Sequence, residues 1–293
     1  MSPGSAEVSQ VEIRLVRIAG QEVHVALYGR EDAARTLLVF NGIGASVATV
    51  APFAAHFRDT RIVTFDVPGV GGSPTPGLPY RLAWLARLAA RLLDALAIGA
   101  VDVFGVSWGG ALAQQFAHDF PGRSRSLTLA ATSAGFVMVP GSLRVLKQLA
   151  TPRRYADPAH MLVVGPDIYG GQLRHDRALL AEHAEAMTAT TGRGYLYQML
   201  AVSGWTSWLW LPRLRLPVLI LMGADDPIVP PINGRIIADR LPDARLEMVA
   251  CGHLFILTDP AGTAARIERF LAGDGDRPAS PPLAVASSSA TEI

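Results

Sequence analysis

One stretch decides the fold of this chain: Val101-Asp102-Val103-Phe104-Gly105-Val106-Ser107-Trp108-Gly109-Gly110. Its first half has the apolar, β-branched character of a strand, and small residues that suit a helix follow the serine. The pattern Gly-x-Ser-x-Gly is informative only in such a strand–turn–helix context. Gly105 and Gly109 lack the Cβ atoms that would collide where a strand and a helix pack closely. We therefore expect Ser107 at the top of a sheet, at the positive end of a helix.

Strand patterns recur on both sides of this stretch. Residues 11–18 and 22–29 alternate apolar with polar side chains, which predicts an N-terminal hairpin. Apolar runs typical of strands occur at residues 36–40, 61–66, 126–131, 217–223 and 245–249. Apolar residues at helical spacing lie between several of these runs, as at residues 82–96. The alternation predicts an α/β protein with a mostly parallel central sheet flanked by helices.

The alternation lapses at residues 135–211, where tyrosines and tryptophans are concentrated. This segment predicts a mainly helical lid, inserted after the sixth strand of the sheet. Residues 1–134 and 212–272 then form the two parts of the core domain. Residues 273–293 are rich in proline, alanine and serine, and we interpret them as a disordered tail.

The composition excludes several classes of partner. The 293 residues carry a formal net charge of only +1, so no excess of basic charge favours nucleic acid. The mean hydropathy of +0.28 is high, yet no apolar run reaches the ~18 residues of a transmembrane segment. Residues 1–10 lack the pattern of a secretory signal, and the single cysteine, Cys251, suits a reducing compartment. We expect a soluble cytoplasmic protein with an apolar surface.

A serine hydroxyl is a poor nucleophile at neutral pH and needs a base that is itself oriented by a third group. In proteins with the Gly-x-Ser-x-Gly turn, the chain order is serine, acid, histidine, with the last two on loops after later strands. Asp226 follows a strand ending at Gly223, and His253 follows the strand at 245–249. Asp225 is an alternative acid, but Asp226 is favoured because Asp-Pro-Ile-Val is the usual continuation. The sequence therefore predicts a triad of Ser107, Asp226 and His253.

A negative tetrahedral intermediate also needs backbone donors. The amide of Trp108, directly after the nucleophile, is one candidate for this oxyanion hole. The amide of Ile43, in the glycine-rich loop after the strand at 36–40, is the other. Such a site uses water alone, so no cofactor and no metal ion is implied.

The motifs together resemble one family, the intracellular medium-chain-length poly(3-hydroxyalkanoate) depolymerases of the α/β-hydrolase superfamily. The similarity extends over roughly residues 11–271 and lies in segments 40–45, 65–73, 105–118, 152–155, 168–171, 204–207 and 252–255. It implies that Ser107, Asp226 and His253 are catalytic. It further implies an enzyme bound to storage granules, which cleaves the polyester to 3-hydroxy acids or short oligomers.

The aromatic residues of the predicted lid have two interpretations. Trp205, Trp208 and Trp210 could bind the polyester and its alkyl groups, or they could pack the lid onto the core. Two other functions also stay open: a soluble carboxylesterase or thioesterase acting on small acyl substrates, and a granule-coating protein whose triad is not used. An intact serine, aspartate and histidine set argues against the coat protein.

Overall fold

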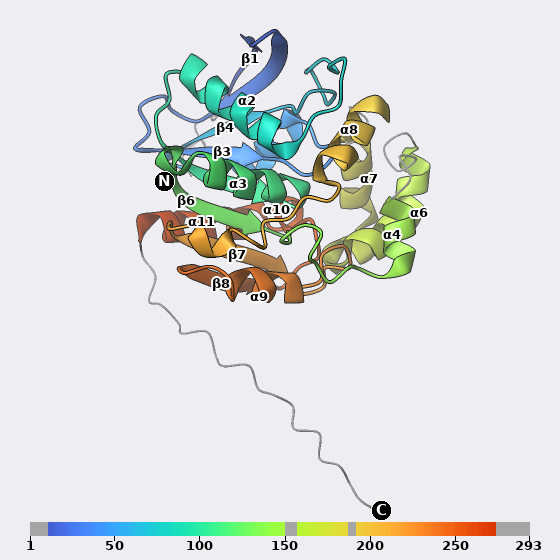
Figure 1. Ribbon diagram of the computed structural model, residues 1–293. Coiled ribbons are helices and arrows are strands. Elements are labelled where there is room, and N and C mark those ends of the chain that lie inside the picture. The colour runs from blue at the N-terminus through green and yellow to red at the C-terminus, as the bar shows by residue number, and fades with distance from the viewer. Residues whose placement is uncertain (1–10, 150–156, 187–191, 274–293) are drawn as a thin grey trace, which may run out of the picture.

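The chain was analysed as a computed structural model, which describes residues 11–149, 157–186 and 192–273 (Figure 1). Its described residues form one eight-stranded sheet with the order β1-β2-β4-β3-β5-β6-β7-β8. The β1–β2 and β2–β4 pairs are antiparallel, and every other neighbouring pair is parallel. The predicted α/β fold with a mostly parallel sheet is confirmed.

The strands are β1 Val11–Ile18, β2 Gln21–Tyr28, β3 Arg35–Phe40, β4 Thr60–Phe65, β5 Val101–Val106, β6 Ser124–Ala130, β7 Val218–Gly223 and β8 Ala244–Val249. The helices of the core are α1 Ala51–Ala54, α2 Leu82–Ala95, α3 Trp108–Asp119, α9 Ile232–Ala238, α10 Phe255–Thr258 and α11 Pro260–Ala272. The last of these begins as its sequence indicates, because the Asp259 side chain caps it by accepting from the Gly262 amide at 3.0 Å.

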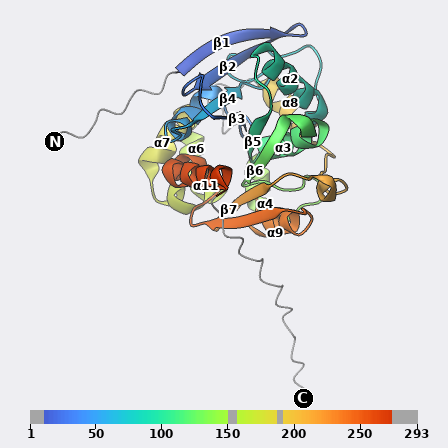
Figure 2. The ribbon, with the colours of Figure 1, turned by 90° about the vertical axis from the view of Figure 1, so that its left-hand side faces the viewer.

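Helices cover both faces of the sheet, with α2, α3 and α9 on one face and α1, α10 and α11 on the other (Figure 2). Strand residues alternate between the two cores. In β3, Leu38 and Phe40 contribute to the first core, whereas Leu37 and Val39 contribute to the second. Strands buried on both faces are apolar throughout, which is why they appear in the sequence as continuous runs.

The chain leaves the core after β6 and returns at β7 by way of a helical insertion. Its helices are α4 Leu143–Leu149, α6 Pro158–Tyr169, α7 Arg177–Ala186 and α8 Gly192–Val202, with 3-10 turns η3 Gly171–Arg174 and η5 Leu211–Arg213. In Figure 1 these α-helices lie together to the right of the sheet. They share a small core that includes Met161, Ile168 and Leu180. A helical insertion after the sixth strand was the predicted arrangement.

Three predicted features fall outside the described residues: the polar N-terminus, the segment 152–155 that carries part of the resemblance, and the proline-rich tail. Across the described part of the chain, every helix is too short or too polar to cross a membrane.

Candidate active site

Ser107 occupies the sharp turn between β5 and α3. Its backbone has a φ of +54°, a conformation that costs a residue with a side chain energy and persists only where the surroundings enforce it. A Cβ on Gly105 would run into the carbonyl oxygen of Gly109, and one on Gly109 into that of Phe40. Both glycines of the motif therefore permit the close packing of α3 on the strands, and this packing holds Ser107 in place.

His253 and Asp226 meet Ser107 at the end of the sheet. His253 Nε2 lies 3.0 Å from Ser107 Oγ, and His253 Nδ1 lies 2.7 Å from Asp226 Oδ2. His253 comes from the loop after β8 and Asp226 from the loop after β7. Since the carboxylate accepts from Nδ1–H, the imidazole presents Nε2 as an acceptor to the serine hydroxyl. The three side chains thus form the hydrogen-bonded chain that activates a serine.

The acid of this arrangement is fixed from both sides. Asp226 Oδ1 accepts from the backbone amides of Ile228 and Val229, both at 2.9 Å, which leaves Oδ2 for His253. The Asp226 and His253 side chains are almost completely buried. Asp226 is therefore held in one orientation toward the ring, away from competing water.

Asp225 has a different set of partners. Its Oδ2 accepts from the Gly171 amide at 2.7 Å and from Arg174 Nε at 2.9 Å. The hydrogen bond from Arg174, followed by that from Gly171, lowers the pKa of the Asp225 carboxyl. Asp225 therefore bonds to the insertion, whereas Asp226 bonds to His253.

The two candidate oxyanion donors lie on either side of Ser107. Trp108 is the first residue of α3, where backbone amides have no partner within the helix. The loop after β3 approaches from the other side, since a Cβ on Gly42 would lie 3.9 Å from the Ser107 Cβ. Ile43 and Trp108 both line the cavity into which Ser107 opens. The two backbone amides stay the candidates for an oxyanion hole next to Ser107.

That cavity has a volume of about 380 Å³ and is mainly apolar. The core contributes Ile43, Val106, Ile228, Leu254 and Leu257, together with Ser107 and His253. The insertion contributes Met138, Leu146, Leu149, Tyr169, Tyr195 and Met199. The insertion therefore forms one wall of the cavity, which suits an acyl group with an alkyl chain.

Trp205, Trp208 and Trp210, for which the sequence left substrate binding and packing open, do not line this cavity. Trp205 Nε1 donates to Gln115 on α3 at 2.7 Å, and Trp210 stacks on His118 of the same helix. Arg240 lies over the ring of Trp208, 4.1 Å from its centroid. These amphipathic rings join the end of the insertion to the core, which is the packing interpretation.

Two residues of the site were missed by the sequence analysis. The backbone oxygen of Tyr169 accepts from the His253 amide at 2.8 Å. Gln198 contacts both the loop after β3 and the start of α3, the two segments that carry the candidate oxyanion donors. Tyr169 lies in segment 168–171, which carries the resemblance, so that segment could have indicated it. Gln198 follows a tyrosine in an ordinary helical pattern and has no signal in the sequence.

Residues 35–260 match the family model of the alpha/beta hydrolase fold. The solved enol-lactonase from Burkholderia xenovorans LB400 superposes with a TM-score of 0.77, covering 88% of this chain and all of that one at 22% identity, a likeness of fold alone. The chain belongs to the α/β-hydrolase fold family and is a hydrolase.

Two curated relatives extend this result. Poly(3-hydroxyalkanoate) depolymerase of Ectopseudomonas oleovorans is 48% identical over 265 residues, which are 90% of this chain and 94% of that protein. 3-oxoadipate enol-lactonase 2 of Acinetobacter baylyi is 27% identical over 263 residues, 85% of this chain and 92% of that protein. The resemblance to poly(3-hydroxyalkanoate) depolymerases inferred from the motifs is confirmed.

Proposed function

We propose that this enzyme hydrolyses the ester bonds of medium-chain-length poly(3-hydroxyalkanoate), a storage polyester, through an acyl-enzyme on Ser107. One observation carries the proposal: the hydrogen-bonded Ser107, His253 and Asp226 open into an apolar cavity of about 380 Å³. The 48% identity to the depolymerase of E. oleovorans supports the choice of substrate.

The first half of the reaction transfers an acyl group to the enzyme. Ser107 Oγ bonds to the ester carbonyl carbon as His253 Nε2 accepts the hydroxyl proton. The carbonyl oxygen becomes negative and is stabilised by the amides of Ile43 and Trp108. When the intermediate collapses, the C–O bond of the ester breaks and His253 returns the proton to the leaving alcohol.

The second half repeats these steps with water. His253 removes a proton from water, the hydroxide attacks the acyl-enzyme, and Ser107 leaves with the proton. Asp226 stabilises the imidazolium that forms in each half. Products are 3-hydroxy acids or short oligomers, and the overall reaction consumes only water.

Residues 135–211 act in this proposal as the lid of the active site, between core segments 1–134 and 212–272. Among the residues that the structure describes, nine exposed large apolar side chains belong to this segment, including Phe136, Leu143, Val163 and Leu196. Met199 lines the cavity and is also 41% exposed, so apolar surface continues from the cavity to the outside of α8. Exposed apolar patches mark contact surfaces, and a hydrophobic polyester granule is a partner of matching chemistry.

The test compares three substrates: purified long-side-chain polyester granules, a short-chain polymer, and a soluble p-nitrophenyl ester. We expect release of 3-hydroxy acids or oligomers from the granules, and no release with Ser107→Ala. Cleavage restricted to small esters or thioesters would replace the proposal with a soluble carboxylesterase or thioesterase. Granule binding without hydrolysis by the wild type would indicate a coat protein.

Granule docking has its own matched pair of variants. Leu196→Ser on α8 removes a side chain that is 52% exposed, and Leu15→Ser on β1 removes one that is 60% exposed. We expect the first to weaken co-sedimentation with granules while hydrolysis of the soluble ester is retained. The second should change neither quantity, and equal losses in both variants would remove α8 from the docking surface.

A further inference from the structure

Gln198 of α8 contacts both segments that carry the candidate oxyanion donors. Its side-chain Oε1 accepts from the Gly44 amide at 3.0 Å, and its backbone oxygen accepts from Trp108 Nε1 at 2.9 Å. Gln198 is only 1% exposed. One residue of the insertion thus bridges the loop after β3 and the start of α3.

These two contacts reach the residues next to the reacting atoms. The amide of Gly44 belongs to the planar peptide unit that joins it to Ile43, so a hydrogen bond there restricts the orientation of Ile43. The Trp108 indole belongs to the residue whose own backbone amide follows Ser107. An oxyanion hole lowers the barrier only when its donors are oriented before the charge develops.

Gln198 is itself held firmly. Its Nε2 lies 3.5 Å from the Gly194 carbonyl one turn earlier on α8, which directs Oε1 toward Gly44. Gly194 packs directly on the backbone of Gly69, in the loop after β4, where a Cβ on either glycine would collide with the other residue. This part of the insertion therefore packs directly on the core backbone.

We propose that Gln198 is a positioning residue of the oxyanion hole, so that the insertion contributes to catalysis as well as to the cavity. The inference rests on the serine-hydrolase mechanism of the proposed function, and is independent of which ester is the natural substrate. Without the Oε1 acceptor, the Gly44 amide loses its buried partner and the loop 41–44 can relax away from Ser107.

The experiment uses two nearly isosteric variants and one control in the full chain. Gln198→Met removes the acceptor, and Gln198→Glu retains an oxygen at the same place. Gln114→Met is the matched control, since Gln114 is also a buried glutamine whose Oε1 accepts from Ser207 of the insertion at 2.7 Å, and its Nε2 donates to the Gly110 and Ser133 carbonyls and not to the loop 41–44. All are assayed on a soluble p-nitrophenyl ester, so a failure of the polyester proposal leaves this test intact.

Binding of a trifluoromethyl ketone isolates the oxyanion hole. Ser107 Oγ adds to the ketone carbon, its proton passes to His253, and the ketone oxygen becomes an oxyanion in the hole. Loss of one full donor costs about 10²–10³ in kcat, so a displaced donor in Gln198→Met should lower kcat about 10- to 100-fold. Affinity for the ketone should fall in parallel, while KM and the pH profile of kcat/KM, which reports His253, change little.

We expect Gln198→Glu to retain most of the activity, and Gln114→Met to lose thermal stability with the ketone affinity unchanged. Unchanged ketone affinity in Gln198→Met, or the same loss in Gln114→Met, would overturn the proposal. If Gln198→Met does not fold, Trp108→Phe decides, because it keeps the backbone amide and an aromatic ring in the cavity wall and removes the indole bond to Gln198. Its ketone affinity must fall, and an unchanged value would equally reject the proposal.

Discussion

Two histidines of this chain, His253 and His24, each pair through Nδ1 with a buried aspartate, and the distance to the carboxylate oxygen is 2.7 Å in both. The aspartates, Asp226 and Asp66, are equally buried, with side chains 0% and 1% exposed. Both pairs also have a serine nearby, Ser107 in one case and Ser73 in the other. By local chemistry alone the two clusters are alike.

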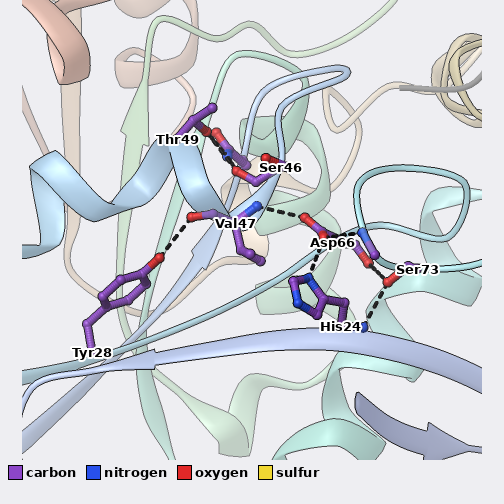
Figure 3. Close-up of polar contacts among 9 residues, drawn as sticks. His24, Tyr28, Ser46, Val47, Thr49, Asp66 and Ser73 are labelled. Atoms are coloured by element: carbon purple, nitrogen blue, oxygen red, sulfur yellow. Dashed lines mark hydrogen bonds and ion pairs between the residues drawn. The ribbon is translucent and has the colours of Figure 1, made fainter. Parts of the chain in front are cut away.

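The difference lies in what the serine does, since the second carboxylate oxygen accepts from backbone amides in both clusters. Ser73 Oγ donates to the backbone oxygen of Asp66 and accepts from the His24 amide, so it is bound to backbone groups (Figure 3). Asp66 accepts from the amides of Val47 and Gly72, which joins the loops after β3 and β4. Ser107, by contrast, meets a ring nitrogen inside a cavity. A histidine–aspartate pair becomes a catalytic base only where its other nitrogen faces a nucleophile that substrate can reach.

The largest effect should separate the two serines. Ser107→Ala removes the nucleophile, and we expect kcat on a soluble ester to fall by about 10⁶, as when the serine of a triad is lost. Ser73→Ala should leave kcat nearly unchanged, because Ser73 only connects backbone groups. Active-site titration with a phosphonate should label the Ser73 variant alone. Near wild-type turnover by Ser107→Ala, with contaminating esterase excluded, would contradict the mechanism.

Substitution of Asp226 should mainly lower kcat, whereas substitution of Asp66 should mainly lower the free energy of unfolding. Asp226→Asn should lower kcat by about 10⁴, because the amide favours the wrong tautomer of His253. Asp66→Asn should instead lower the free energy of unfolding by about 3 kcal/mol, since bonds to a buried charged group are replaced by weaker ones. Urea unfolding and steady-state kinetics measure the two effects. If the two variants lose the same property, the distinction between the clusters is wrong.

Asp225, the acid next to Asp226, should show a smaller effect on kcat. Asp225→Asn should reduce kcat far less than Asp226→Asn, because Asp225 bonds to Arg174 and Gly171 and not to His253. The lowered pKa of Asp225 stabilises the fold above the ordinary aspartate pKa, and this contribution is lost as the pH falls through the folded value. The pair is exposed, so the contribution is at most about 1 kcal/mol. Acid unfolding of Asp225→Asn and Asp226→Asn would measure this contribution to stability.

The smallest effect concerns Tyr28, which bonds to the backbone oxygen of Val47, the residue whose amide donates to Asp66. Tyr28 donates its hydroxyl hydrogen to the Val47 oxygen, and burial followed by the charge of Asp66 raises the pKa of Tyr28 to about 12. The fold therefore keeps the phenol protonated, and this stability is present below pH 10 and lost as the pH rises toward 12. Tyr28→Phe should unfold with less dependence on pH in that window. An identical alkaline unfolding profile would show that burial of the Tyr28 phenol does not couple stability to pH.

Much of the fold and part of the site could be predicted because they depend on neighbours in the chain. The periodicity of β3 and β5, and the glycines around Ser107, report the local backbone. Ser107, Asp226 and His253 were singled out because each directly follows a strand, and parallel strands end at the same edge of a sheet. The insertion was visible as a lapse in the same alternation.

The rest was decided only by tertiary structure, because it depends on which side chains meet across long separations. Asp225 and Asp226 are adjacent, and only the positions of Arg174 and of the Ile228 amide divide their roles. Trp205 and Trp210 meet α3 across about 90 residues of chain, and Gln198 reaches Gly44 across 154. Amino-acid composition and hydrophobic periodicity do not reveal such contacts, because the contacts depend on how the insertion packs on the sheet. The sequence by itself determined the fold and predicted the nucleophile and its base, whereas packing alone decided the wall of the cavity and the contacts of Gln198.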